Sequence, residues 1–285
     1  DSDHHAGENI RQAGEDVQQG KIVLQAGVRL NPADLGVLAS LGLSQLQVKR
    51  KPVVAFFSTG DELMPVGKPL EPGMIYDSNR YSLYGMLKHL PVDVLDLGVV
   101  RDNPESMREV LADAAERADL IISTGGVSVG EADYIKPALE DLGNTEFWKI
   151  AMKPGKPLMF GQFNGTPMLG LPGNPVSAFV TAVLFAKPLI AHLSGAREPF
   201  AQPIPATLAA PLPAVPKRTD HVRAIYEAGQ VTPIGLNDSA ALSALSRANA
   251  LIVRPAGSAP AASGDMVEIL LIGRASCRER VSSPV

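Results

Sequence analysis

The stretch DLIISTGGVSVGEADY, residues 119–134, determines how the rest of this chain is interpreted. Its first half is a short apolar run that ends at Ser123, which predicts a buried strand. Three glycines and two acidic residues follow, before a helical pattern expected at about residues 134–142. A strand that ends in a glycine loop and continues into a helix presents backbone N–H groups to an anion. We therefore predict that this loop forms the floor of the active site.

Around this stretch, short apolar strands alternate with amphipathic helices. We expect strands at residues 53–57, 92–100, 119–123, 147–151 and 158–160, and helices at 79–90, 103–118 and 175–192. Asn-Pro pairs at residues 103–104 and 174–175 predict helix starts, and Pro188 is expected to kink the last helix. Such alternation predicts a parallel α/β sheet with right-handed crossovers, whose ligands bind at the carboxyl ends of the strands.

The chain is expected to have four parts. They are a small N-terminal segment at 1–50, an α/β domain at 51–198, a small C-terminal β domain at 199–272 and a disordered or foreign tail at 273–285. In the first part we expect short strands at 21–30, a helix from Asn31-Pro32 to Gly42, and a solvated polar linker around Asp16. Proline-rich residues 199–216 predict a linker or an edge strand, and further strands are expected at 222–226, 251–253 and 266–272.

Composition excludes several classes of protein. The chain is 45% hydrophobic and 20% charged, as in ordinary globular proteins, and its net charge of −4 without a basic block argues against nucleic acid as a partner. The one cysteine, Cys277, allows no disulfide framework and suits a cytoplasmic location. The longest apolar run, 176–186, is interrupted by Ser177 and Thr181, so we expect no membrane helix. No signal-peptide pattern opens the chain.

Acidic residues follow several of the predicted strands. Asp61, Glu62, Asp102 and Asp133 lie in loops expected at the same edge of the sheet. Taken singly, each acid is explained by helix capping or by the helix dipole. Taken as a cluster beside a phosphate-binding loop, they predict a Mg²⁺ site, because this ion prefers hard oxygen ligands.

Two further patterns allow alternative interpretations. Lys149, Lys153 and Lys156 form either a solvated turn or a site for a multiply charged anion, and the nearby glycine loop favours the anion. Residues 126–130 fit GxSxG, for which His192 or His221 would have to complete a hydrolase site, but the flanking glycines and acids favour an anion loop. Neither a Walker A sequence nor a GxGxxG at the first βα turn is present.

Four motifs in a fixed order carry a resemblance to a known family. They are TGDEL at 59–63, TGGVSVGEADY at 124–134, KPGKP at 153–157 and LPGNPVS at 171–177. Together they resemble the molybdopterin molybdenumtransferase (MoeA) family, to which the E domain of gephyrin also belongs. The resemblance extends from about residue 7 to 272 and implies an N-terminally truncated chain. The implied α/β fold has a parallel-sheet molybdopterin-binding domain, a small N-terminal segment and a small C-terminal β domain.

The resemblance also implies an activity. Family members insert molybdenum from molybdate into adenylylated molybdopterin, with Mg²⁺-dependent release of AMP. The substrates would be molybdopterin-AMP and molybdate, and the cofactor Mg²⁺. An elongated homodimer is implied, with the C-terminal domain near the partner's active site, as is contact with the molybdopterin adenylyltransferase. The C-terminal residues of interest are then Ser243, Ser246, Arg247 and Asn249.

Residue roles carry over where the motifs match. Asp16, Glu62, Asp102 and Asp133 fall on acids important for activity, and we expect the last three to ligate Mg²⁺. Asp16 therefore becomes part of the expected site despite its polar surroundings. The predicted molybdopterin-binding residues are Thr59, Gly60, Gly125, Gly126, Ser128, Gly130, Lys149, Lys153, Lys156, Pro172, Gly173, Asn174 and Pro175.

Three other functions stay open at this point. A molybdopterin adenylyltransferase would share the α/β domain and the TGG loop, but neither the C-terminal β domain nor LPGNP. A non-catalytic molybdopterin-binding scaffold would keep the fold without the reaction, although the intact acids argue against it. A generic phosphate-binding α/β enzyme remains if the resemblance misleads.

Overall fold

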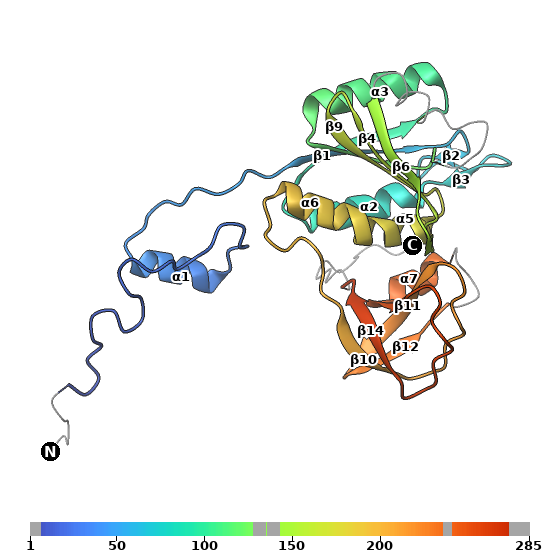
Figure 1. Ribbon diagram of the computed structural model, residues 1–285. Coiled ribbons are helices and arrows are strands. Elements are labelled where there is room, and N and C mark those ends of the chain that lie inside the picture. The colour runs from blue at the N-terminus through green and yellow to red at the C-terminus, as the bar shows by residue number, and fades with distance from the viewer. Residues whose placement is uncertain (1–6, 128–134, 136–142, 236–240, 274–285) are drawn as a thin grey trace.

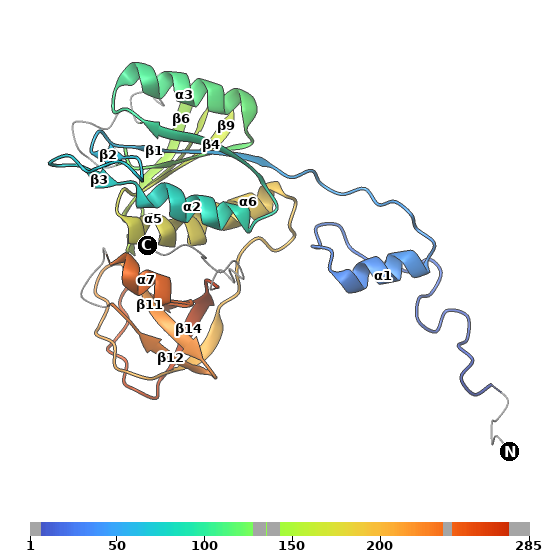
Figure 2. The same ribbon diagram turned by 180° about the vertical axis from the view of Figure 1, so that it is seen from behind.

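The computed structural model describes residues 7–127, 135, 143–235 and 241–273. Figures 1 and 2 show it from opposite sides as an α/β layered part, a smaller β part beneath it, and an N-terminal arm that extends away from both. Of the four predicted parts, the first three occupy different regions of space, and the tail lies outside the described residues from 274 onward.

A six-stranded sheet with the order β4-β1-β5-β9-β8-β6 forms the centre of the α/β part. Its strands are β1 (Val53–Thr59), β4 (Asp93–Val100), β5 (Leu120–Thr124), β6 (Gly143–Lys149), β8 (Pro157–Phe163) and β9 (Thr166–Leu171). The first four in the order are parallel, as predicted, whereas β8 runs antiparallel to both β9 and β6. The reversal occurs at Asn164 and Gly165, whose φ angles of +48° and +80° suit a tight hairpin turn.

Helices cover both faces of this sheet (Figures 1 and 2). One face carries α3 (Pro104–Arg117), and the other carries α2 (Ser78–Lys88), α5 (Pro175–Thr181) and α6 (Lys187–Leu193). Successive side chains of β1 point to opposite faces of the sheet, so Phe57 packs against the α3 layer and Phe56 against the α2 layer. Both phenylalanines are fully buried, so the sheet is the core of this part of the molecule.

The predicted last helix is continuous but locally widened. Between α5 and α6 the chain forms a π-helix, Ala182–Ala186, and Pro188 lies in the first turn of α6. Proline has no N–H to donate, so the regular hydrogen-bond pattern is interrupted here, and the predicted kink takes the form of a wider turn. The helix from Pro175 to Leu193 is long and apolar enough to cross a membrane, and half of its most apolar window is buried inside the structure.

The second six-stranded sheet has the order β12-β10-β14-β13-β11-β7 and closes on itself because β12 also pairs with β11. Its elements are β7 (Met152–Lys153), β10 (Ile204–Leu208), β11 (Thr219–Glu227), β12 (Gln230–Pro233), β13 (Ala250–Arg254) and β14 (Met266–Leu271), with the short helix α7 (Leu242–Arg247). The predicted strands at 222–226, 251–253 and 266–272 are confirmed. β10 lies in the proline-rich segment, and β7 comes from the α/β part.

The N-terminal arm comprises residues 7–51 and contains the predicted helix, α1 (Pro32–Ser40), capped by Asn31. The strands predicted at 21–30 are wrong. Turns occur there instead, with Gly20 and Gly27 at φ +82° and +84°, and no described strand pairs with this segment. The arm meets the body where the Arg197 N–H donates to the Gly27 carbonyl at 3.1 Å. A small separate sheet lies near the other end of β1. It consists of two two-residue strands, β2 (Leu63–Met64) and β3 (Ile75–Tyr76).

Candidate functional site

The carboxyl ends of the strands meet at one edge of the α/β sheet. β4, β1, β5 and β9 point the same way, and β6 also does, because it is antiparallel to β8, which is itself antiparallel to β9. The loop 153–157, which leads from β6 to the start of β8, therefore lies at the same edge as the loops after β1, β4, β5 and β9. The predicted convergence of these loops is present in the structure.

Three acidic residues come together at this edge. The hydroxyl of Thr59 donates to Oδ1 of Asp102, and the backbone N–H of Asp102 donates to Oδ1 of Asp61 at 3.2 Å. Glu62 folds back over Gly60, where an added Cβ would lie 2.8 Å from both carboxylate oxygens of Glu62. Gly60 also has a φ of +154°, which favours glycine. Glycine at this position therefore lets the Glu62 carboxylate approach the end of β1.

Asp102 is the acid that this environment changes most clearly. Partial burial raises its pKa, and the negative charges of Asp61 and Glu62 raise it further, while the hydrogen bond from Thr59 lowers it. Ionised Asp102 is thus held in a place that disfavours its charge. A cation beside the Asp102 carboxylate would offset this cost. Carboxylates whose pKa is shifted in this way are common in functional sites.

The glycine loop lies directly against the acidic loop. Gly125 donates its N–H to the carbonyl of Leu171 at 3.1 Å, and an added Cβ at Gly125 would come within 2.4 Å of the carbonyl oxygen of Thr59. An added Cβ at Gly126 would come within 2.8 Å of the Thr59 methyl and of Ile135. Both glycines have positive φ, at +85° and +63°, so the predicted requirement for glycine has a steric cause. Ser128, Gly130, Asp133 and all of the predicted helix 134–142 except Ile135 lie outside the described residues.

The LPGNP loop forms the other side of the glycine loop. Gly173 packs on Gly125, with an added Cβ 3.7 Å from the Gly125 Cα, and Pro172 is buried. Asn174 caps α5 by accepting from the Ser177 N–H at 3.2 Å, and Pro175 opens the helix. The predicted residues of this motif are thereby placed beside the first glycines of the organising stretch.

Asn79 was missed by sequence reasoning. Its side-chain N–H donates to the Gly173 carbonyl at 2.7 Å, and its Oδ1 is buried without a partner in the described structure. Asn79 had been predicted as the start of the helix, but Asp77 is the cap, so the Asn79 side chain is free for another role. The signal was the DSN sequence at residues 77–79, which holds more capping residues than one helix needs.

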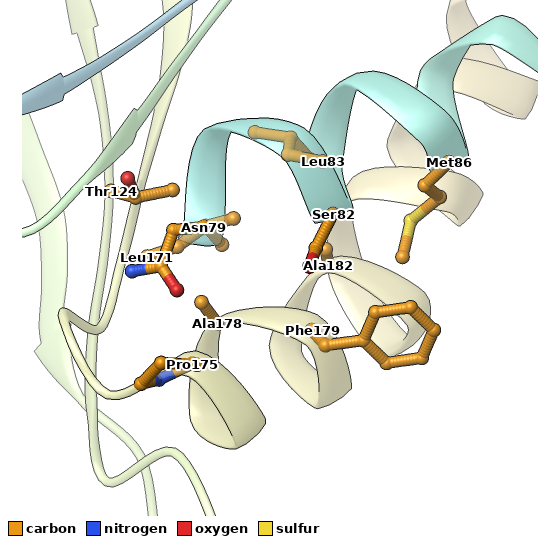
Figure 3. Close-up of a pocket in the computed structure, with 10 residues that line it drawn as sticks. All are labelled: Asn79, Ser82, Leu83, Met86, Thr124, Leu171, Pro175, Ala178, Phe179 and Ala182. Atoms are coloured by element: carbon orange, nitrogen blue, oxygen red, sulfur yellow. The ribbon is translucent and has the colours of Figure 1, made fainter. Parts of the chain in front are cut away.

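Between α2 and α5 this region leaves only a small hollow, shown in Figure 3 with Asn79 and Thr124 on one side and Phe179 on the other. Its volume of about 10 Å³ suits at most one water molecule. A cavity of about 260 Å³ lies elsewhere, lined by apolar residues such as Phe147 and Phe185 and by none of the predicted site residues. Neither of these two cavities is lined by Glu62 or Asp102, and the candidate site is drawn from the loops at the sheet edge.

The three predicted lysines are exposed around the same edge. Lys149 ends β6 opposite Pro157, and the Ile150 N–H donates to the Lys156 carbonyl at 3.1 Å, which closes the turn. Nζ of Lys153 lies 3.5 Å from Oδ2 of Asp220 on β11. Lys153 thus connects the site to the C-terminal sheet, whereas Lys149 and Lys156 are exposed beside it.

Asp16 does not join the other acids in a single copy of the chain. It is exposed in the N-terminal arm, beyond the start of β1, whereas the acidic loops lie at the opposite end of that strand (Figures 1 and 2). Its role stays a prediction. In the C-terminal part, the Asn249 side chain pairs with the Tyr226 backbone at 2.7 and 2.9 Å, Ser246 donates to the Ser243 carbonyl, and Arg247 is exposed at the end of α7.

The donors present suit Mg²⁺ better than a transition metal. Although Asp61, Glu62 and Asp102 are neighbours, the described residues contain no group of three His, Cys, Asp or Glu side chains arranged to hold a metal ion by themselves. Mg²⁺ commonly uses one or two carboxylates together with substrate phosphates, and Glu62 and Asp102 supply such oxygens. Asp133, the third predicted ligand, is outside the described structure, so the complete set stays a prediction.

Comparison with known families matches most of the chain. The family described as "Probable molybdopterin binding domain" matches residues 55–192. The MoeA C-terminal region (domain IV) matches residues 205–272, and the MoeA N-terminal region (domain I and II) matches residues 1–42.

Individual relatives agree with these matches. The chain is 42% identical over 268 residues to the molybdopterin molybdenumtransferase of Haemophilus influenzae, covering 92% of this chain and 66% of the relative. It is 36% identical over 279 residues to that of Staphylococcus epidermidis, covering 96% of this chain and 67% of the relative. A solved structure of the molybdopterin biosynthesis MoeA protein from Pyrococcus horikoshii superimposes with a TM-score of 0.78 at 31% identity, covering 90% of this chain and 64% of that one.

The chain thus spans about two thirds of the length of the relatives it matches. Over that length the identity, the three family regions and the fold agree with one another. The chain therefore belongs to the MoeA family of molybdopterin molybdenumtransferases.

Proposed function

We propose that this chain inserts molybdenum from molybdate into adenylylated molybdopterin, with Mg²⁺-dependent release of AMP. One observation supports this most strongly: Thr59, at the end of β1, contacts Gly125 and Gly126 of the glycine loop and also donates to Asp102, which follows β4. An oxygen-rich acidic position beside backbone N–H groups suits a cation and a phosphate anhydride bound together. The names of the relatives point to the same reaction.

Glu62 and Asp102, together with Asp133, are the side chains that would hold Mg²⁺. The chemistry that Mg²⁺ would supply there is positive charge to offset that of the phosphates during loss of AMP. The raised pKa of Asp102 supports a cation at this place, because burial and the neighbouring charges make its ionised form costly without one.

The chain's own groups bind and orient the substrates. The Gly125 N–H is already bonded to the Leu171 carbonyl, so the phosphates of the adenylylated molybdopterin would bind to other backbone N–H groups of the loop 125–130. Lys149, Lys153 and Lys156, with Arg247 from the C-terminal part, hold molybdate, a tetrahedral dianion, close to the dithiolene sulfurs. The packing of Gly173 on Gly125 fixes the loop that carries these contacts.

The test is AMP release from adenylylated molybdopterin, measured with and without Mg²⁺ and with and without molybdate. Release that requires both supports the proposal. Binding without release would indicate a scaffold or an incomplete site. Formation of molybdopterin-AMP from ATP would instead identify an adenylyltransferase, and failure to bind would leave only a generic phosphate-binding enzyme.

Substitutions of the acids sharpen this test. Glu62→Gln and Asp102→Asn should each lower AMP release at least about 100-fold while leaving the fold intact. Asp113→Asn is the matched control, because Asp113 pairs with Arg117 at 2.7 Å on the exposed surface of α3 and the charge change is the same. Equal release by Glu62→Gln, Asp102→Asn and Asp113→Asn would remove the acids from the mechanism.

The homodimer, the contact with the adenylyltransferase and the cytoplasmic location implied by the resemblance belong to the same proposal. Exposed apolar side chains on the arm support a covering partner, since Ile22 is 79% and Val48 70% exposed. A molar mass from light scattering equal to that of one chain would contradict the homodimer.

A further inference from the structure

The side chain of Thr59 touches both halves of the candidate site. Thr59 is the last residue of β1 and is only 4% exposed. Its hydroxyl donates to Oδ1 of Asp102 on one side. Its methyl group lies against Gly126 on the other, 2.8 Å from where a Cβ would stand, and its carbonyl oxygen faces Gly125.

The chemistry of threonine makes this double contact rigid. The hydroxyl and the methyl are attached to the same Cβ, so one χ1 angle fixes the directions of both groups. The preceding residue, Ser58, does not share this role, because its hydroxyl pairs with the Thr124 hydroxyl at 2.9 Å inside the sheet. Movement of Asp102 relative to Gly126 would therefore break one of the two contacts of Thr59.

We propose that Thr59 is a positioning residue, which holds the Asp102 carboxylate at a fixed place relative to the glycine loop through its hydroxyl and methyl groups. The inference rests on the proposed function, in which Asp102 serves the cation and the loop binds the phosphates. Groups that orient a metal-binding carboxylate typically change metal affinity or activity about 10–100-fold when removed. Thr59 itself need not touch the substrate with its side chain.

Two substitutions separate the two contacts. Thr59→Val keeps the shape and the methyl contact but removes the hydroxyl, whereas Thr59→Ser keeps the hydroxyl and removes the methyl. Thr59→Val should lower AMP release about 10–100-fold and raise the Mg²⁺ concentration needed for half-maximal release. AMP release by Thr59→Ser should be at least about tenfold higher than AMP release by Thr59→Val. An equal loss in both variants, with an unchanged Mg²⁺ requirement, would overturn the assignment.

A double-mutant cycle tests the contact without any substrate. Thr59→Val should lower the urea midpoint of the chain with Asp102 present and leave it nearly unchanged in an Asp102→Ala background, because the partner is then gone. Thr124→Val is the control: it also removes a buried hydroxyl, but its effect should be the same in both backgrounds. Additive effects of Thr59→Val and Asp102→Ala would refute the proposal. Absence of AMP release from the unsubstituted chain would instead count against the proposed function, and the cycle would still decide the role of Thr59.

Discussion

Replacement of Gly125 by alanine should strongly destabilise the α/β part of the molecule. The backbone of Gly125 has a φ of +85°, which costs about 1–2 kcal/mol for a residue with a Cβ. The new methyl would also stand 2.4 Å from the Thr59 carbonyl oxygen, a backbone atom of the central sheet. Forcing these atoms apart adds about 1–3 kcal/mol, so the total is about 2–5 kcal/mol.

Gly98→Ala provides the matched control. Gly98 has nearly the same φ, +82°, but no atom lies within 4 Å of its added Cβ. Gly98→Ala should therefore lower the free energy of unfolding only by the cost of the positive φ, about 1–2 kcal/mol. The difference between the two variants isolates the collision with Thr59.

The assay is urea unfolding followed by the fluorescence of Trp148, the one tryptophan of the chain. This residue lies in β6 of the same sheet, and the C-terminal β part contains no tryptophan, so the signal follows the relevant unfolding. With a slope of about 2 kcal/mol per M, the midpoint of Gly125→Ala should fall about 0.5–1.5 M below that of Gly98→Ala. Equal midpoints would show that the glycine loop is not packed on the end of β1, and the site geometry derived from that packing would fail.

Further predictions concern other contacts. Asn79→Ala should lower the free energy of unfolding by about 1 kcal/mol, because the hydrogen bond to the Gly173 carbonyl is lost. Asn79→Asp should lower it further, because a carboxylate would then face that carbonyl. Urea midpoints equal to that of the unsubstituted chain would contradict the hydrogen bond. Asp119→Ala should lower the midpoint by more than Arg50→Ala, since the exposed arginine is paired only at the surface while Asp119 also accepts a backbone N–H of β1 at 2.8 Å. Burial lowers the pKa of His221, so the folded chain binds fewer protons than the unfolded one and loses stability as pH falls below the ordinary value of 6.5. Calorimetry should therefore show a smaller fall in melting temperature from about pH 8 to about pH 5 for His221→Gln than for the unsubstituted chain. An equal fall in both would refute this.

Local patterns were enough to predict the strands that are buried on both faces. β1 and β5 are short β-rich runs whose buried apolar residues pack into the helix layers on both faces of the sheet, so the apolar run identifies them. β9 was missed although it is central, because Pro167 and Gly170 interrupt its sequence. Pro167 is tolerated because the pairing with β5 begins only at Met168. The Asn164-Gly165 pair before it was the available hairpin signal.

The candidate site was predictable to the extent that it follows strand ends. Glu62, Asp102 and Gly125 lie just after the ends of parallel strands that the pattern predicted, so their proximity was expected. The role of Asn79 was not, because its partner Gly173 lies 94 residues away and only the packed structure brings them together. The strands expected at 21–30 failed for the opposite reason, since apolar residues there have no partner strand in the described structure.

The two-residue strand β7 has a mechanical consequence. Met152 and Lys153 belong to the loop that carries the lysines, yet they pair with Thr219 and Asp220 as the edge of the C-terminal sheet. Met152 is also buried against Leu251 of that sheet. A hinge rotation of the C-terminal part would therefore pull on the lysine loop or unzip β7. The position of the lysine loop is therefore tied to the orientation of the C-terminal sheet.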